Sequence, residues 1–299
     1  MASQQDLKRR IRSVRNTRKI TKAMELVAGA RLRRAEARIQ AMRPYADRMR
    51  ELMIGTARAA GPLTSRLPLL EEREETRSVA ILPVTGDRGL AGPFNTQILR
   101  RAFALERELE AAGQGATWLV VGKKGRSTLT FRRYELAGAW VGFTDRPMYG
   151  DAGAITHRVI DLFVQREVDR VVLVYNRYIS PLTQRVETLE LLPVPRRALE
   201  EEDKTPYEIA LEGDFIYEPE PEEILARLLP AYVETAVYRA LLESAASELG
   251  ARMTAMRNAS KNANELIDRL TLDMNRARQA DITREILEVV AGADALEFG

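Results

Sequence analysis

Apolar positions recur at alternating three- and four-residue steps through the last quarter of the chain. This spacing is typical of a coiled-coil seam, in which one stripe of a long helix packs against a second helix. It predicts a helix from Pro221 to Leu296. The seam is rich in Ala, Ser and Met where a maximally stable coiled coil has Leu and Ile, so the two helix axes should approach closely. Its members are Leu242, Ala246, Leu249, Met253, Met256, Ser260, Ala263, Ile267, Leu270, Met274 and Ala277.

The start of the chain carries a looser version of this stripe and predicts a helix from Leu7 to about Arg58. At about 1.5 Å per residue the two helices would be roughly 80 Å and 110 Å long, more than the diameter of a small domain. The ends of an inserted domain usually lie close together, so the helices should pair antiparallel, and the longer one should end in an unpaired tip. The N-terminal seam positions are Leu7, Ile11, Val14, Thr17, Thr21, Met24, Ala28, Leu32, Ala35, Ile39 and Met42.

Between these helices the pattern changes to short apolar runs that alternate with helical segments. Strands that alternate with helices indicate a Rossmann-like, mostly parallel sheet with covering helices. The last run alternates apolar and polar residues, as an exposed edge strand does. The predicted fold class is therefore α/β plus a long antiparallel coiled coil. The expected strands are 78–84, 117–121, 168–175 and 184–192, and the expected helices are 93–112 and 148–166.

The same changes of pattern divide the chain into five expected segments. The coiled-coil helices occupy residues 1–60 and 221–299, and the central α/β domain occupies residues 77–195. A linker at 61–76 and an acidic, Pro-containing linker or foot at 196–220 join them.

Composition restricts the chemistry and the membrane contacts of the chain. It has no cysteine, which excludes disulfides and thiol catalysis. No stretch approaches the roughly 20 apolar residues that cross a bilayer, and the N-terminus lacks the apolar core of a secretory signal. Membrane contact is therefore expected to be peripheral. The single histidine, His157, is expected on a solvent-facing or helix-packing position.

Positive charge is concentrated in the N-terminal helix. Residues 7–50 hold 15 Lys and Arg against three acidic residues, a net charge of +12 in a chain whose total is +3. Such a helix suits nucleic acid, an anionic membrane surface or an acidic protein partner, or it is simply a solvated face. Tyr45 is its only aromatic residue. An acidic protein collar around a basic helix pair therefore fits better than nucleic acid.

Two glycine-containing loops lie where a nucleotide-binding fold would bind phosphate. The spacing of Gly86, Gly89 and Gly92 matches neither G-x-G-x-x-G nor G-x-x-x-x-G-K-[ST], so we interpret them as turn residues; phosphate binding at a helix N-terminus is a weaker alternative. The segment from Gly122 to Gly125 is interpreted as a basic turn, with anion binding as the alternative. No metal-ligand or acid/base pattern is evident, so we expect no catalysis and no cofactor or metal.

Three collinear blocks resemble the γ subunit family of ATP synthase. Residues 7–28 read LKRRIRSVRNTRKITKAMELVA, which is similar to the N-terminus of that family. Residues 87–95 (DRGLAGPFN) resemble its DRGL-x-G segment. Residues 251–256 (ARMTAM) and 278–283 (RQADIT) resemble its C-terminal motif, so the resemblance covers the whole chain.

The resemblance implies a non-catalytic central rotor stalk of a proton-translocating, bacterial-type ATP synthase. Its implied partners are the ring of three α and three β subunits, the ε subunit and the membrane c ring. The active sites of such a complex lie on the partner subunits. The implied location is the cytoplasmic side of the cell membrane, with peripheral attachment through the complex and no contact with nucleic acid.

The resemblance also implies contact residues. By position in the motifs, Met24, Arg252, Gln279 and Thr283 match sites of contact with the catalytic ring and of coupling. Met24 is also a seam residue, so packing alone would explain it. The segment from Phe215 to Pro219, with Tyr217 and Glu218, resembles the family's contact with ε and the c ring.

The chain departs from the family pattern at two neighbouring positions. Ala91 stands where the family usually has Cys, and Pro93 stands where a small residue is common, which affects the expected turn. Two other classes of protein stay open from the residues alone. One is a basic coiled-coil scaffold that binds nucleic acid, and the other is an α/β enzyme with helical oligomerisation arms.

Overall fold

The computed structural model describes residues 4–61, 67–195, 198 and 218–297. The chain divides into two compact units. The first, which we call the paired-helix unit, joins Met1–Ala28 to Arg252–Gly299. The second, the globular unit, is Gly29–Ala251.

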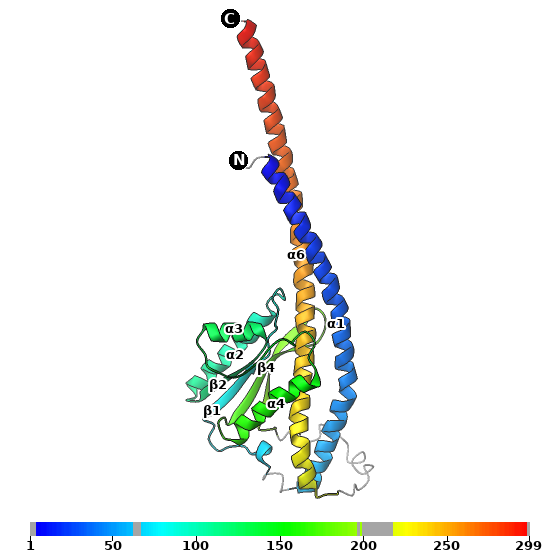
Figure 1. Ribbon diagram of the computed structural model, residues 1–299, viewed down its shortest axis with the longest axis vertical. Coiled ribbons are helices and arrows are strands. Elements are labelled where there is room, and N and C mark those ends of the chain that lie inside the picture. The colour runs from blue at the N-terminus through cyan, green and yellow to red at the C-terminus, as the bar shows by residue number, and fades with distance from the viewer. Residues whose placement is uncertain (1–3, 62–66, 196–197, 199–217, 298–299) are drawn as a thin grey trace. The chain divides into compact units, whose positions relative to one another are not determined.

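The two predicted terminal helices are confirmed (Figure 1). Helix α1 spans Gln4–Ala60 and helix α6 spans Pro221–Glu297. Most predicted seam positions are buried or half-buried, among them Leu7 and Ile11 in α1 and Met256 and Ile267 in α6.

The prediction for one seam position, Thr17, is wrong. Its side chain is exposed, and the neighbouring Arg18 is half-buried instead. The reason is a polar contact, because the Arg18 guanidinium reaches Asn264 on the facing helix. A hydrophobic template does not anticipate an arginine in a seam.

The globular unit contains one five-stranded sheet, and its mostly parallel character is as predicted. The strand order is β3-β2-β1-β4-β5, in which β1–β2, β1–β4 and β2–β3 are parallel and β4–β5 is antiparallel. The alternating strand lies at an edge, as expected. The strands are β1 Ser78–Pro83, β2 Gly115–Val121, β3 Leu136–Trp140, β4 Arg170–Tyr178 and β5 Gln184–Leu192.

Helices cover both faces of this sheet (Figure 1). On one face Val79 and Ile81 of β1 pack with residues of α2 (Phe94–Ala111) and α3 (Lys123–Phe131). On the other, Ala80 and Leu82 pack with α4 (Tyr149–Val164) and with the globular-unit parts of α1 and α6. A short 3-10 helix, η2 (Pro68–Leu70), adds to this second core. Successive β1 side chains point to opposite faces of the sheet, and both faces are covered. The strand is therefore apolar at consecutive positions.

Three elements were missed by the sequence prediction, and one of them is η2, which lies in the expected linker at 61–76. Helix α3 begins where we expected a basic turn, and Gly122 is its N-cap residue with φ 95°. Strand β3 is short and built from LAGAW, which lacks the β-branched residues that mark strands. Only Gly125 and Leu129 of α3 are buried, so its helical stripe is too short to detect.

Candidate partner-contact site

A polar ladder joins α1 to α6 within the paired-helix unit. As the residue number rises along α1, the number of its partner falls along α6, so the helices are antiparallel, as predicted. The residue numbers of each pair add up to 281 or 282, so the two helices keep one constant register. The pairs are Arg18–Asn264 at 2.6 Å, Thr21–Ser260 at 2.7 Å and Glu25–Arg257 at 3.2 Å.

Glu25 is the buried charged residue of this ladder, and the sequence pattern did not reveal it. Its side chain is only 9% exposed. Oε1 accepts a hydrogen bond from Arg257 Nε, and Oε2 lies 3.0 Å from Lys22 Nζ. The hydrogen bond from Lys22 is the main cause that lowers the pKa of Glu25; burial opposes it, and Arg257 adds to it. The carboxylate is therefore held in its charged form.

Two of the expected coupling residues lie beside this ladder. Met24 precedes Glu25 and is half-buried, and Arg252 is half-buried on α6. From the register, Met24 lies level with about residue 258, so the two are separated by roughly 9 Å along the helix axis. The structure thus places both on the same stretch of the helix pair.

The other two expected coupling residues lie on the α6 segment beyond the start of α1. The constant register puts Gln4 level with about residue 278, so Gln279 and Thr283 lie past the first described residue of α1 (Figure 1). Both are exposed, and Thr283 Oγ1 donates to the Gln279 carbonyl over 2.9 Å. The expected unpaired end of α6 is confirmed for the described residues. Its exposed apolar side chains are Ile282, Ile286, Leu287, Val289 and Val290.

The last two expected contact residues lie just before α6. Tyr217 falls outside the described residues. Glu218 is exposed and stands three residues before Pro221, where α6 begins. The structure therefore leaves their role as a prediction.

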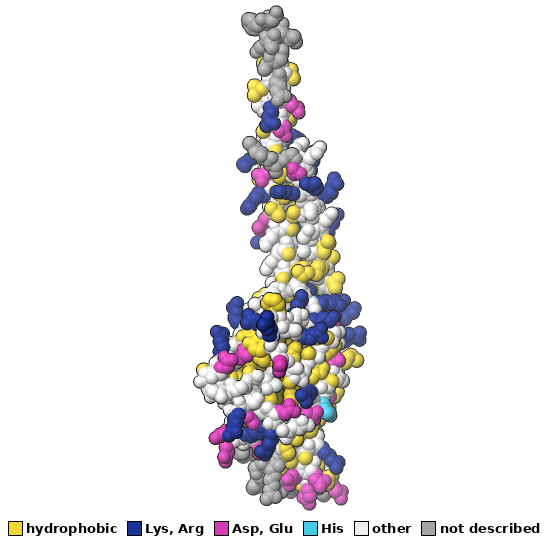
Figure 2. All heavy atoms as spheres, turned by 60° about the vertical axis from the view of Figure 1, so that its left-hand side comes forward, with side chains coloured by type: hydrophobic (Ala, Val, Ile, Leu, Met, Phe, Trp, Pro, Cys, Tyr) yellow, Lys and Arg dark blue, Asp and Glu magenta, His cyan; other side chains and the backbone are white. Residues whose placement is uncertain are grey.

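The basic character of α1 is displayed on its solvent side. In Figure 2 the Lys and Arg side chains project from the surface. Among the α1 cations of the paired-helix unit, Arg18 is the half-buried exception, because it belongs to the polar ladder. The exposed cationic residues of this unit on α1 are Lys8, Arg9, Arg10, Arg12, Arg15, Lys19 and Lys22.

The DRGL loop is organised by the carboxylate of Asp87. Oδ1 accepts the backbone N–H of Lys123, the first residue of α3, over 2.9 Å. Oδ2 accepts the backbone N–H groups of Gly142 and Thr144 at 2.8 and 3.1 Å and the Thr144 hydroxyl at 3.0 Å. Burial alone would raise the pKa of Asp87, but these hydrogen bonds outweigh it and lower the pKa. Asp87 thus ties the loops after β1, β2 and β3 together.

Helix α6 closes the edge of the sheet where a Rossmann-type fold binds its ligand. That edge is the carboxyl end of the strands, at the change of strand order between β1 and β4. Ser244 Oγ donates to the Val84 carbonyl over 3.4 Å, and Ser247 Oγ donates to the Asn176 carbonyl over 3.0 Å. A Cβ on Gly86 would lie 2.8 Å from the carboxylate of Glu248, which is 2% exposed. A protein carboxylate therefore stands where a phosphate would be expected.

This contact refines the interpretation of the glycines. Gly92 has φ 55° and is a turn residue, as predicted. Gly86 has a different environment, because a Cβ there would meet the Glu248 carboxylate of α6, which would have to shift. Ala91, which stands in place of the family's Cys, is buried beside Phe94 in the core under α2.

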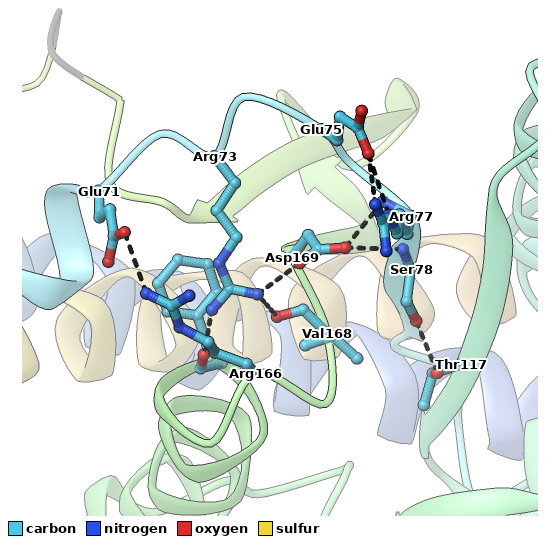
Figure 3. A network of polar contacts seen from close by, with 10 residues as sticks. Glu71, Arg73, Glu75, Arg77, Ser78, Thr117, Arg166, Val168 and Asp169 are labelled. Carbon is cyan, nitrogen blue, oxygen red and sulfur yellow. Dashed lines mark hydrogen bonds and ion pairs between the residues drawn. The ribbon is translucent and has the colours of Figure 1, made fainter.

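A second polar network fastens the opposite end of the sheet (Figure 3). Arg73 donates to Asp169 Oδ1 at 2.5 Å and to the carbonyls of Val168 and Phe163 at 2.8 and 2.6 Å. The other Asp169 oxygen accepts the backbone N–H groups of Arg77 and Ser78. Burial alone would raise the pKa of Asp169, but the Arg73 and backbone hydrogen bonds lower it overall. Asp169 thus joins the start of β1 to the start of β4.

The described residues contain no group of three or more His, Cys, Asp or Glu that would hold a metal ion. His157 is 82% exposed on α4 and lies 3.0 Å from Asp161, which confirms its predicted solvent position. Among the helices described, none combines the length and the apolar character needed to span a membrane.

Apolar side chains exposed at the end of α6 favour a chain that packs against partner subunits. The ATP synthase family profile matches residues 3–296. The chain is 49% identical over 299 residues, the full length of both chains, to the ATP synthase gamma chain of Rubrobacter xylanophilus. It is 46% identical to that of Desulforamulus reducens, over 99% of this chain and all of the relative. The chain belongs to the ATP synthase gamma chain family.

Solved structures agree with this assignment. The central stalk and c-ring structure of Tetrahymena thermophila mitochondrial ATP synthase contains a chain 28% identical to this one, with a TM-score of 0.58. The match covers 81% of this chain and 99% of that one. A chain of Euglena gracilis mitochondrial ATP synthase shares the fold, with a TM-score of 0.67 at 19% identity over 98% of this chain and 94% of that one.

Proposed function

We propose that this chain is the central rotor stalk of a proton-translocating ATP synthase. In this role it couples proton flow through a c ring to the conformational cycle of the catalytic sites in an α3β3 ring. The observation that carries the proposal is the antiparallel helix pair, in which helix α6 continues past α1 with exposed apolar side chains. Family membership favours this function over a scaffold that binds nucleic acid.

The surface of the paired-helix unit suits a shaft that turns inside a collar. Its α6 end exposes several apolar side chains, which can slide against an apolar collar without breaking ion pairs at each step. Its α1 side is basic and solvent-facing, which suits acidic segments of the surrounding ring. The two sides differ in chemistry. Three similar partners around them therefore experience different contacts, and differential contact is what shifts conformational populations.

Individual residues take proposed roles within this function. Met24, Arg252, Gln279 and Thr283 contact the α3β3 ring and transmit coupling. Exposure supports this role for Gln279 and Thr283, and half-burial on the pair supports it for Met24 and Arg252. Tyr217 and Glu218 belong to the foot, where ε and the c ring bind. We propose the segments 1–60, 61–76, 77–195, 196–220 and 221–299 as the functional divisions.

The chain itself is proposed to be a non-catalytic subunit. The placement of Glu248 against Gly86 supports this, because a second anion at that edge of the sheet would be repelled. Attachment to the cytoplasmic side of the cell membrane is proposed to be peripheral and to run through the complex.

Reconstitution with the α and β subunits of the same source tests the proposed function. We expect an active ATPase that contains one copy of this chain for each three αβ pairs. Well-folded α and β subunits that assemble with each other but exclude this chain would refute the proposal. Salt-sensitive binding to DNA or RNA by the free chain would favour the nucleic-acid alternative instead.

A further inference from the structure

Glu25 is the one charged side chain that is buried among the described residues of the paired-helix unit. It lies in a seam built mostly from small and apolar residues, between Thr21 and Ala28, which is 2% exposed. A carboxylate in such a place is unfavourable unless charged or polar donors surround it. Its two partners come from different places: Lys22 from its own helix and Arg257 from α6.

Only the contact with Arg257 depends on the helices being together. If the first part of α1 separates from α6, Glu25 loses Arg257 but keeps Lys22, which is bound within α1. The Arg257 bond closes a ladder whose other rungs are the Thr21–Ser260 and Arg18–Asn264 pairs. Small seam residues bury little apolar area. The three polar pairs therefore contribute more than usual to the specificity with which α1 pairs with α6.

We infer that Glu25 is a positioning residue. Through Arg257 it holds the first turns of α1 on α6 and fixes the face of the pair on which Met24 lies. Met24 lies in the same helix turn as Glu25, so separation of α1 from α6 would move Met24 relative to Arg252. This inference has a pairing half, which concerns the contact between the helices, and a functional half. The functional half rests on the proposed function, because it predicts that coupling of proton pumping to ATP hydrolysis depends on Glu25, a residue that itself faces the seam.

The pairing half is tested on the full chain by native-state hydrogen exchange. In Glu25→Ala and Arg257→Ala the backbone amides of residues 8–21 should exchange about tenfold faster than in the wild type. Arg257→Ala should have the larger effect, because it leaves the carboxylate without its cross-helix partner. The double variant should be no worse than Arg257→Ala, since the buried charge is then removed as well.

Matched variants separate the cross-helix bond from charge alone. Lys22→Ala removes a partner whose side chain is 58% exposed and leaves the Arg257 bond intact, so exchange should stay near the wild-type rate. Glu25→Gln keeps an oxygen acceptor for Arg257 and should restore most of the protection lost in Glu25→Ala. Because the chain has no cysteine, Ser13→Cys with Asp268→Cys offers a clean spin-label pair. The distance distribution between the two labels should broaden in Glu25→Ala and stay near the wild-type width in Lys22→Ala and Glu25→Gln.

The functional half is tested in the reconstituted, membrane-bound complex. Glu25→Ala should lower the number of protons pumped per ATP hydrolysed while the complex still assembles and hydrolyses ATP, and Glu25→Gln should recover the ratio. Wild-type exchange rates in both single variants would overturn the inference, and so would faster exchange with an unchanged pumping ratio. A wild-type chain that fails to assemble would refute the proposed function instead, and the exchange rates would still decide the pairing half.

Discussion

Replacing Asp87 with alanine should destabilise the globular unit by about 3 kcal/mol. The carboxylate accepts four hydrogen bonds, and hydrogen bonds to a charged group are worth about 1.5–3 kcal/mol each but are not additive when they share one acceptor. Thr144 is buried, so its backbone N–H would lose its partner away from water. The N–H groups of Lys123 and Gly142 are on exposed residues and water replaces the carboxylate there, which limits the total.

The assay is urea unfolding followed by tryptophan fluorescence. The two tryptophans, Trp118 and Trp140, lie in β2 and β3, so the signal reports on the sheet that Asp87 helps to hold. A loss of about 3 kcal/mol should move the midpoint by about 1 M urea or more. The matched control is Asp145→Ala, which removes partly exposed ion pairs with Arg31 and Arg88 and should cost less than about 1 kcal/mol.

The effect should depend on pH in a defined direction. The pKa of Asp87 is lowered in the folded chain, so its carboxylate contributes stability above the unfolded pKa, which is about 3.9. That contribution is lost as the pH falls through the folded pKa. The difference between wild type and Asp87→Ala should therefore be constant near pH 7 and shrink below about pH 4. Equal midpoints for Asp87→Ala and Asp145→Ala at pH 7 would refute the reasoning.

Three further changes follow from the same structure. Gly122→Ala should lower the free energy of unfolding by about 3 kcal/mol or more in the same assay, because φ is 95° and a Cβ would lie 2.2 Å from the Thr85 carbonyl oxygen. The control Gly113→Ala, at φ 75° in open space, should lower it by only about 1 kcal/mol, and similar losses for both variants would contradict this account. Arg73→Met should lower the free energy of unfolding by about 3 kcal/mol, because it leaves the Asp169 carboxylate, whose side chain is 15% exposed, without its cationic partner. The control Arg77→Met changes a side chain that is 83% exposed and should be nearly neutral; the reverse order of urea midpoints would exclude our account of this network. Met24→Lys should lower proton pumping per ATP hydrolysed by adding a charge at a half-buried contact, and an unchanged ratio would count against its proposed role.

Prediction from sequence succeeded where a periodic pattern extends over many residues. The terminal helices repeat their stripe over many turns, so local errors average out, and β1 and β4 contain continuous runs of Val, Ile and Leu that are typical of buried strands. It failed at α3 and β3, which are short and rich in small or polar residues. For the candidate site, motif positions led to Met24, Arg252, Gln279 and Thr283, but no pattern indicated Glu25.

What the sequence by itself determined is therefore the two long helices, the alternating α/β domain between them and the excess of positive charge on α1. These depend on periodicity and composition, which are local properties of the chain. Only the tertiary structure decided which residue meets which. Glu25 contacts Arg257 across 232 positions, Asp87 accepts backbone N–H groups from two other loops, and Glu248 fills the edge of the sheet beside Gly86. Such contacts join residues far apart in the chain, and neither partner's local sequence carries a signal of the other.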